Sequence, residues 1–352
     1  MLNEFKIGNK IIGKNCEPFI IAEAGINHNG DIGLAKKMVL CAKEAGADAV
    51  KFQTFETEEF IRDKSEMYTY QSQGKTITES QYNMFKRTEF SEKDWRKIKE
   101  FCDDNDIVFL STPASEKGAE FLFSLGIDAI KISSDDFINI PLVRKYEAYK
   151  VPVIASCGMA NEDEIRLVLN TLQLDNGHPV CLMLCTSEYP TPLSDVNVRK
   201  LVTMGEKFPK AVLGLSDHSQ GNVSAIAAVA LGARVFEKHF TLSHKLPGPD
   251  HWFSSELDEL KEWIKGIRDA YVSLGNSKLV PTENEKIQRA LMRRSITTAC
   301  EIKKGNIFDD SNLVLLRPGT GIGAEQWDKV IGRKAKYDIK QNSQLNWEDI
   351  DE

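Results

Sequence analysis

The segments VLGLSDH (residues 212–218) and VFEKH (residues 235–239) decide the predicted fold, because each is a short apolar run that ends in a histidine. Other apolar runs end similarly, in Glu23, Lys51 and Gln53, Thr112, Lys131, Ser156 and Thr186. Buried strands do not end in lysine, glutamate or histidine unless those groups have partners. These endings predict one polar site at one rim of a closed barrel.

The same runs alternate with helical patterns. After the first run, for example, Leu34, Met38 and Ala42 recur at helical spacing between a cap at Asp31 and a stop at Gly46. Eight such units in about 275 residues predict a TIM (β/α)8 barrel with short, buried parallel strands. The predicted strands are PFIIAE (18–23), ADAVKFQT (47–54), IVFLST (107–112), DAIKIS (128–133), VPVIAS (151–156), PVCLMLCT (179–186), AVLGLS (211–216) and ARVFEKHF (233–240).

Three segments are predicted along the chain: a barrel domain at 1–275, a linker at 276–289 and a small domain at 290–352. Within the barrel domain, residues 54–92 are polar and predict no strand; an insertion this long is often a lid or an oligomer contact. The small domain shows short β-like runs (SITTA, LVLL) and turn signals (KKG, RPGTG). A domain of this size has a small core and commonly leans on a neighbour.

Composition excludes several classes of protein. Apolar residues make up 41% of the chain, which is enough for a sizeable core. A net charge of −7 does not suggest a nucleic-acid partner. No apolar run is long enough to span a membrane, and the N-terminus lacks the apolar core of a signal peptide. Seven scattered cysteines without a Cys-x-x-Cys pair are interpreted as reduced thiols of a cytoplasmic protein.

Two lysines give the sharpest chemical signal at the predicted rim. Lys51 and Lys131 alternate with apolar residues that face the outer helices, so both should point into the barrel. With the hydroxyls of Ser134, Ser156 and Ser216 close by, they favour a phosphate or a phosphate-plus-carboxylate ligand. The alternative is that each lysine simply pairs with a rim carboxylate such as Glu23 or Glu237.

His218 and His239 end strands that should be neighbours. With Asp217, Glu237 and Glu23 available, they could hold a divalent cation in mixed nitrogen and oxygen coordination. The alternative is a hydrogen-bonded pair of histidines without a metal. Asp250, in LPGPD, follows a rigid turn and is either a fixed substrate contact or a turn-former.

Many motifs of this chain resemble one family. They are AEAGINHNGD, KFQTF, LSTP, KISSDD, SCGMA, CTSEYPTP, GLSDHS and EKHFT, together with RSITTACEIKKGNIF and LLRPGTGI near the C-terminus. The chain resembles the bacterial sialic acid synthases, which condense phosphoenolpyruvate with an N-acylated six-carbon sugar and carry a C-terminal SAF, or antifreeze-like, domain. The resemblance covers nearly the whole chain.

The resemblance implies a TIM barrel, a divalent metal (Mn²⁺ first, Mg²⁺ or Co²⁺ as alternatives) and a domain-swapped homodimer in which one chain's small domain covers the other's barrel mouth. It implies that His218 and His239 hold the metal and that Glu23 lies beside the reacting carbons. The implied phosphoenolpyruvate contacts are Lys51, Lys131, Ser134, Ser156 and Ser216, with Thr112 as a further substrate contact. The implied sugar contacts are Gln53, Tyr189, Asp250 and, from the partner chain, Arg317.

The implied chemistry fits residue types that were found independently. The methylene carbon of phosphoenolpyruvate attacks the aldehyde of the open-chain sugar, which the metal polarises. Water adds at C2, and the tetrahedral intermediate loses phosphate with C–O cleavage. The lysines hold and orient the anion, while Glu23 either steadies the cationic centre or handles protons.

The chain departs from the family pattern around the sugar. Ser187 replaces a frequent asparagine, Asp136 a glutamate, Cys157 a threonine, and Arg293 or Arg294 an aromatic residue. The sequence therefore predicts a nonulosonic acid synthase, with N-acetylneuraminate as the first expectation for its product. The alternatives are a legionaminate-type synthase acting on 2,4-diacetamido-2,4,6-trideoxymannose, or a non-catalytic sugar-binding barrel.

Overall fold

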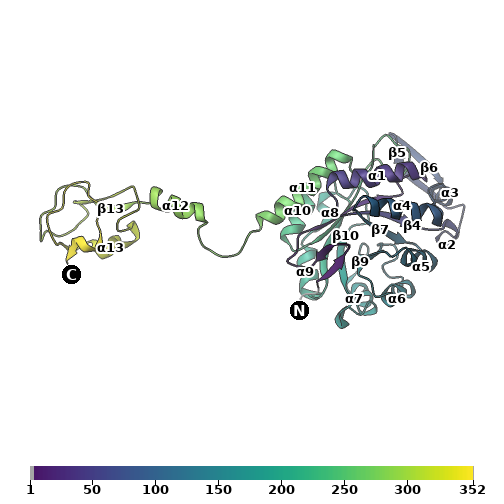
Figure 1. Ribbon diagram of the computed structural model, residues 1–352, viewed down its shortest axis with the longest axis horizontal. Coiled ribbons are helices and arrows are strands. Elements are labelled where there is room, and N and C mark those ends of the chain that lie inside the picture. Colours follow the sequence, from purple (N-terminus) through teal and green to yellow (C-terminus); the bar gives the residue numbers. More distant parts are fainter. Residues whose placement is uncertain (1–3, 352) are drawn as a thin grey trace. The chain divides into compact units, whose positions relative to one another are not determined.

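The computed structural model describes residues 4–351, and the chain forms two compact units, Met1–Gly275 and Asn276–Glu352 (Figure 1). The first unit thus ends at the residue where the predicted barrel segment ends. The predicted linker, 276–289, holds the beginning of helix α12 (Glu283–Met292), which Thr282 and Glu285 cap reciprocally. The Thr-x-x-Glu spacing is the sequence signal for this helix start.

The first unit contains a parallel sheet with the strand order β7-β4-β3-β12-β11-β10-β9-β8. In the described chain no ladder joins β7 to β8, but these two strands lie against each other, so the barrel is nearly closed. The predicted TIM barrel is confirmed. Its strands are β3 (Phe19–Gly25), β4 (Ala49–Thr54), β7 (Val108–Pro113), β8 (Ile130–Ile132), β9 (Val153–Ser156), β10 (Val180–Cys185), β11 (Val212–Asp217) and β12 (Val235–His239).

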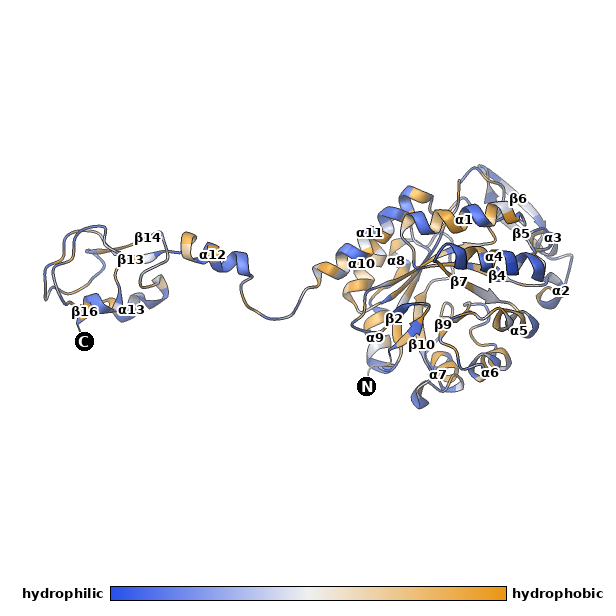
Figure 2. Ribbon diagram, viewed as in Figure 1, coloured by the Kyte–Doolittle hydropathy of each residue, from blue (hydrophilic) through white to orange (hydrophobic). Residues whose placement is uncertain are grey.

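Amphipathic helices cover the outside of the barrel, and those such as α1 and α11 carry both hydropathy colours (Figure 2). Helix α1 begins where Asp31 accepts hydrogen bonds from the backbone of Gly33 and Leu34, and it ends at Gly46 in the left-handed conformation (φ 88°). The helices are α1 (Ile32–Ala45), α4 (Glu92–Asp104), α5 (Glu116–Ser124), α6 (Ile140–Ala148), α7 (Glu162–Thr171), α8 (Leu193–Val196), α9 (Lys200–Lys207), α10 (Val223–Ala230) and α11 (Leu257–Ser273).

The barrel interior has two halves. In the apolar half, toward the N-terminal strand ends, Phe5, Ile7 and Ile12 of the hairpin β1 (Phe5–Ile7) and β2 (Lys10–Ile12) pack on the inward residues. Those inward residues are Phe19, Ile21, Ala49, Leu110, Ala129, Ile154, Cys181, Met183, Val212 and Val235. In the polar half, the same inward faces continue with Glu23, Lys51, Thr112, Lys131, Ser156, Ser216 and Glu237.

The expectation of no strand in residues 54–92 is wrong. The segment forms the antiparallel hairpin β5 (Met67–Ser72) and β6 (Lys75–Ser80), flanked by α2 (Thr57–Phe60) and α3 (Gln81–Lys86). The turn at Gln73 and Gly74 has positive φ angles of 51° and 72°, as a two-residue hairpin turn requires. Its glutamine, in place of the usual asparagine or aspartate, hides the signal. Gln73 Nε2 donates to the backbone carbonyl of Lys245 at 2.8 Å.

The second unit is small and has its own core. Strand β13 (Ser295–Thr298) pairs with β14 (Leu313–Leu316), and β15 (Lys334–Ala335) pairs with β16 (Ile350–Asp351). Helix α13 (Trp327–Val330) lies between these pairs in sequence. The core residues are Ile296, Ile302, Phe308, Leu313, Ile322, Val330, Ala335, Ile339, Leu345 and Ile350.

Across both units, residues 4–351 include no helix that combines the length and the apolar character needed to cross a membrane.

Candidate active site

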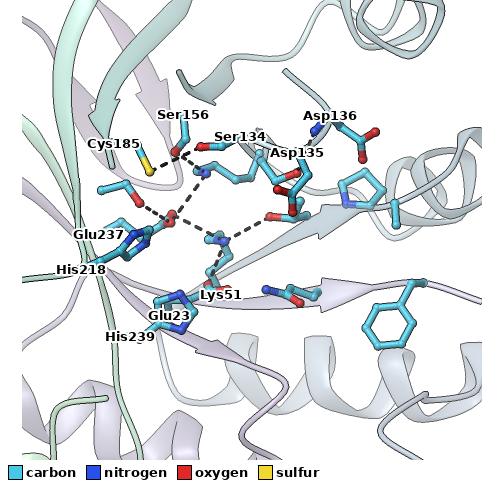
Figure 3. Close-up of a pocket in the computed structure, with 18 of the residues that line it drawn as sticks. Glu23, Lys51, Ser134, Asp135, Asp136, Ser156, Cys185, His218, Glu237 and His239 are labelled. Atoms are coloured by element: carbon cyan, nitrogen blue, oxygen red, sulfur yellow. Dashed lines mark hydrogen bonds and ion pairs between the residues drawn. The ribbon is translucent and has the colours of Figure 1, made fainter. Parts of the chain in front are cut away.

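A cavity of about 350 Å³ opens at the C-terminal ends of the barrel strands, where a TIM barrel carries its chemistry (Figure 3). Its lining brings together most of the residues singled out in the sequence. These are Glu23, Lys51, Gln53, Thr112, Lys131, Ser134, Ser156, Tyr189, Ser216, His218 and His239. Asp250 lies next to His239, and Arg317 belongs to the second unit, so its part in the site stays a prediction.

Lys51 lies between two carboxylates at the base of the cavity. Its Nζ is 2.9 Å from Glu23 Oε2 and 3.6 Å from Glu237 Oε2. It also donates a hydrogen bond to Thr112 Oγ1 at 3.1 Å. Burial disfavours the charge on Lys51, but the two carboxylates outweigh burial and raise the pKa of this lysine. Lys51 therefore remains protonated and forms ion pairs with Glu23 and Glu237.

Lys131 has fewer charged partners. Its Nζ donates to Ser156 Oγ at 2.7 Å and to the carbonyl of Ile132 at 3.2 Å, and it lies 3.6 Å from Glu237 Oε1. Burial lowers the pKa of Lys131 despite the attraction of Glu237. A bound anion would therefore stabilise the charged form of Lys131 more than that of Lys51.

The two carboxylates differ in how they titrate. Burial raises the pKa of Glu23 to about 7, and the ion pair with Lys51 only partly offsets burial. Burial would also raise the pKa of Glu237, but Lys131 and Lys51 hold it below its ordinary value. Paired groups whose pKa values are pushed apart divide the acid and base roles between them. Glu237 stays ionised, while Glu23 can gain or lose a proton near neutral pH.

His218 and His239 are neighbours, with ring centroids 5.5 Å apart. Nδ1 of His218 lies 2.8 Å from the carbonyl oxygen of Thr186, which only accepts, so Nδ1 carries the proton and Nε2 keeps a free lone pair. Nδ1 of His239 is buried without a hydrogen bond. Burial lowers the pKa of His218 to about 4 and that of His239 well below its ordinary value. Both rings are therefore neutral at pH 7, as metal ligands must be.

A divalent metal fits these two residues as an open site. Within residues 4–351, no group of three or more His, Cys, Asp or Glu side chains could enclose a metal. The two imidazoles would supply nitrogen ligands, and water or substrate oxygens would complete the shell. The expectation that Asp217 is available is wrong. Trp263 Nε1 donates to its Oδ2 at 2.9 Å, and Lys238 Nζ lies 3.2 Å from the same oxygen.

Tyr189 and Asp250 flank the histidines. The Tyr189 ring packs on His218 with centroids 4.1 Å apart. The carboxylate of Asp250 lies 4.0 Å from Nδ1 of His239, and burial raises the pKa of Asp250 to about 7. The Asp250 carboxylate is thus held beside the site, and its role as a substrate contact stays a prediction.

Sequence reasoning missed two features of the site. Glu237 is considered in the sequence only as a possible partner of a lysine or a metal and not as a residue of the cavity base, although its place between Phe236 and Lys238 on β12 gives it the same inward direction as His239. The second feature is an apolar wall of the cavity, to which the segment 54–92, interpreted as a polar insertion and possible lid or oligomer contact, contributes three phenylalanines. The apolar wall consists of Phe55, Phe60, Phe85, Pro113 and Ala114.

Comparisons with known proteins agree with this geometry. Residues 38–279 match the NeuB family, and residues 293–351 match the SAF domain. The chain is 40% identical to N,N'-diacetyllegionaminic acid synthase of Legionella pneumophila over 98% of each chain. It is 33% identical to human N-acetylneuraminate-9-phosphate synthase over 97% of this chain and 94% of the relative.

Solved structures point the same way. The N-acetylneuraminic acid synthetase of Leptospira borgpetersenii, solved in complex with citrate, superposes with a TM-score of 0.74 and 33% identity, covering 82% of this chain and 95% of that one. The family match spans more than half of the sequence, and the relatives cover nearly all of it. The chain therefore belongs to the NeuB family and carries a SAF domain at residues 293–351.

Proposed function

We propose that this protein condenses phosphoenolpyruvate with an N-acetylated six-carbon aldose, giving a nonulosonic acid and phosphate. The observation that carries this proposal is the base of the cavity. Two buried lysines and neighbouring serine hydroxyls lie there beside two neutral histidines, within a NeuB-family barrel. Lysines and hydroxyls suit a phosphate-plus-carboxylate anion.

The protein's own residues do the following work. Lys51 and Lys131 bind and orient phosphoenolpyruvate, so that its methylene carbon faces the sugar aldehyde. A new C–C bond forms there as the enol double bond opens and the aldehyde C=O becomes an alkoxide. Water adds to the cation that results at C2, and the proton it releases is passed on to the alkoxide, which becomes the product hydroxyl. Glu23 accepts the proton that this water loses, which its pKa near 7 permits. The tetrahedral intermediate then expels phosphate through C–O cleavage.

A divalent cation, with Mn²⁺ preferred and Mg²⁺ or Co²⁺ as alternatives, would be held by His218 and His239 and would supply Lewis-acid polarisation of the aldehyde. Tyr189 and Asp250, which contact or flank these histidines, limit how the sugar can enter.

For the sugar, we favour a 2,4-diacetamido-2,4,6-trideoxyhexose over N-acetylmannosamine. Two relatives named N,N'-diacetyllegionaminic acid synthase, from Legionella pneumophila and Campylobacter jejuni, share 40% and 38% identity with this chain, against 33% for the human neuraminate-9-phosphate enzyme.

We further propose that the enzyme is a cytoplasmic homodimer in which Arg317 of one chain contacts the N-acyl group bound by the other. Replacement of Arg317 by alanine should then raise KM for the sugar far more than KM for phosphoenolpyruvate. Light scattering should give twice the chain mass. A monomer that is fully active would refute this arrangement.

A direct assay tests the proposed function. The full chain is incubated with Mn²⁺, phosphoenolpyruvate and, separately, N-acetylmannosamine, its 6-phosphate and 2,4-diacetamido-2,4,6-trideoxymannose. Phosphate release and product mass are measured for each sugar. Release that requires a sugar and yields the condensed acid supports the proposal; no release with any of the three refutes it.

A further inference from the structure

The cavity has one side that the proposed chemistry does not use. This side is the apolar wall, in which Phe55, Phe60 and Phe85 form an edge-to-face cluster. Their ring centroids are 5.5 Å (Phe55 to Phe60), 5.3 Å (Phe55 to Phe85) and 5.0 Å (Phe60 to Phe85) apart. Pro113 and Ala114 extend the same surface.

The cluster is not simply packed into the core. Phe55 is buried, but Phe60 is 39% exposed and Phe85 is half-buried, while all three line the cavity. Large apolar side chains that remain accessible on the wall of a cavity are suited to contact an apolar part of a ligand.

The position of the wall relative to the anion site follows from strand β4. Lys51 and Gln53 face the cavity from β4 (Ala49–Thr54), about 7 Å apart at ~3.3 Å per residue, and Phe55 lines the cavity just beyond the end of that strand. An open-chain six-carbon sugar is about 6–7 Å long, because its five C–C bonds are each about 1.5 Å. A sugar whose C1 meets the enol carbon near Lys51 therefore spans about the distance to Gln53, and its far end, C6, lies toward the wall.

The chemistry of the wall selects between sugars. None of its five side chains has a polar atom, so a hydroxyl pressed against it would lose its hydrogen bonds to water without replacement. A methyl group there would instead be removed from water at no polar cost. We infer that the apolar wall binds the C6 methyl of a 6-deoxy sugar and is a specificity determinant against sugars with a C6 hydroxyl. This inference rests on the proposed function.

Two matched sugars test the inference. One is 2,4-diacetamido-2,4,6-trideoxymannose, and the other is its analogue with a hydroxyl at C6, so the pair differs by one oxygen atom. At saturating phosphoenolpyruvate and Mn²⁺, we expect kcat/KM to favour the 6-deoxy sugar at least tenfold, within the ~10–200-fold range typical of such small differences.

Variants of the wall show whether these residues cause the preference. F60Y and F85Y each place a hydroxyl on the wall and should reduce the preference at least threefold, without changing KM for phosphoenolpyruvate. F85L keeps the wall apolar and should retain it. The matched control is F123Y, because Phe123 stacks on Tyr149 outside the cavity, with centroids 3.4 Å apart. Circular dichroism verifies that each variant is folded.

The outcomes separate the inference from the proposed function. If the wild-type enzyme converts both sugars with equal kcat/KM, the inference is wrong and the proposed function stands. If the preference exists but F60Y and F85Y leave it at the wild-type value, the wall does not cause it and the inference is again wrong. If neither sugar supports phosphate release, the proposed choice of sugar fails and the inference fails with it.

Discussion

The two halves of the barrel interior are built on the same strands and face the same axis, yet they have opposite properties. In the apolar half, Ile21, Ala49 and Val235 pack with the β1–β2 hairpin. Two residues further along each strand, Glu23, Lys51 and Glu237 fill the polar half with buried charges. The apolar half stabilises the barrel, whereas the polar half carries groups whose burial disfavours their charged forms.

Removal of the proposed metal should have the largest effect on activity, because its two candidate ligands, His218 and His239, lie in the polar half. Treatment with a chelator should reduce turnover by about a thousandfold or more, since Lewis-acid stabilisation contributes several kcal/mol. Added Mn²⁺ should restore activity. Calorimetric titration should show one Mn²⁺ site in the wild type and none in a H218A/H239A variant. Full activity after exhaustive chelation would exclude the metal.

Replacement of a lysine in the polar half should come next. K51A and K131A should each lower kcat/KM for phosphoenolpyruvate roughly a hundredfold, because removal of one buried charge costs ~2–5 kcal/mol. The control is K265A, whose exposed pair with Asp269 should contribute almost nothing. Steady-state kinetics with phosphoenolpyruvate varied would measure the effect. Unchanged values in both lysine variants would refute the anion site.

A substitution that leaves a void in the apolar half should lower stability without changing catalytic activity. Ile7 is fully buried against the barrel interior, so I7A should lower the free energy of unfolding by about 2–5 kcal/mol. Urea unfolding would measure this loss. At temperatures where the variant is folded, its kcat/KM should stay within about twofold of the wild type. A large loss of activity in folded I7A would show that the two halves are coupled.

The smallest effect concerns pH. The pKa of Glu23 is about 7 in the folded protein and near 4.5 when unfolded, so the folded state binds the extra proton between these values. Its contribution to stability is therefore complete below pH 4.5 and is lost as pH rises to 7. The difference in unfolding free energy between wild type and E23Q should change by ~1–3 kcal/mol across this window. A constant difference would contradict the raised pKa.

The fold was predictable because buried parallel strands leave short apolar runs at regular intervals, and all eight barrel strands contain the predicted runs. The two hairpins were not predicted. Strands β1 and β2 are three residues each, and β5 and β6 are mostly exposed, so neither pair shows a strong apolar alternation. Both hairpins depend on contacts with distant residues, which a local pattern does not contain.

The candidate site was predictable where alternation along a strand fixed the direction of a side chain. Lys51 and Lys131 line the cavity as this rule required, and the two histidines line it because they lie at the ends of neighbouring strands. Asp217 shows the same rule applied incompletely: it lies between the inward residues Ser216 and His218, so it must point outward. The distances between side chains on different strands could not be predicted from a sequence pattern. In particular, Glu237 lies 3.6 Å from both Lys51 and Lys131.

The hairpin β1–β2 determines from which end of the barrel ligands can enter and leave the cavity. Because Phe5, Ile7 and Ile12 close the barrel at the N-terminal ends of its strands, the active-site cavity opens only at the C-terminal ends. In a cavity with a single opening, the ligand that binds deepest must bind first. Under the proposed function, we therefore expect phosphoenolpyruvate to bind at Lys51 and Lys131 before the sugar, and the condensed acid to leave before the phosphate.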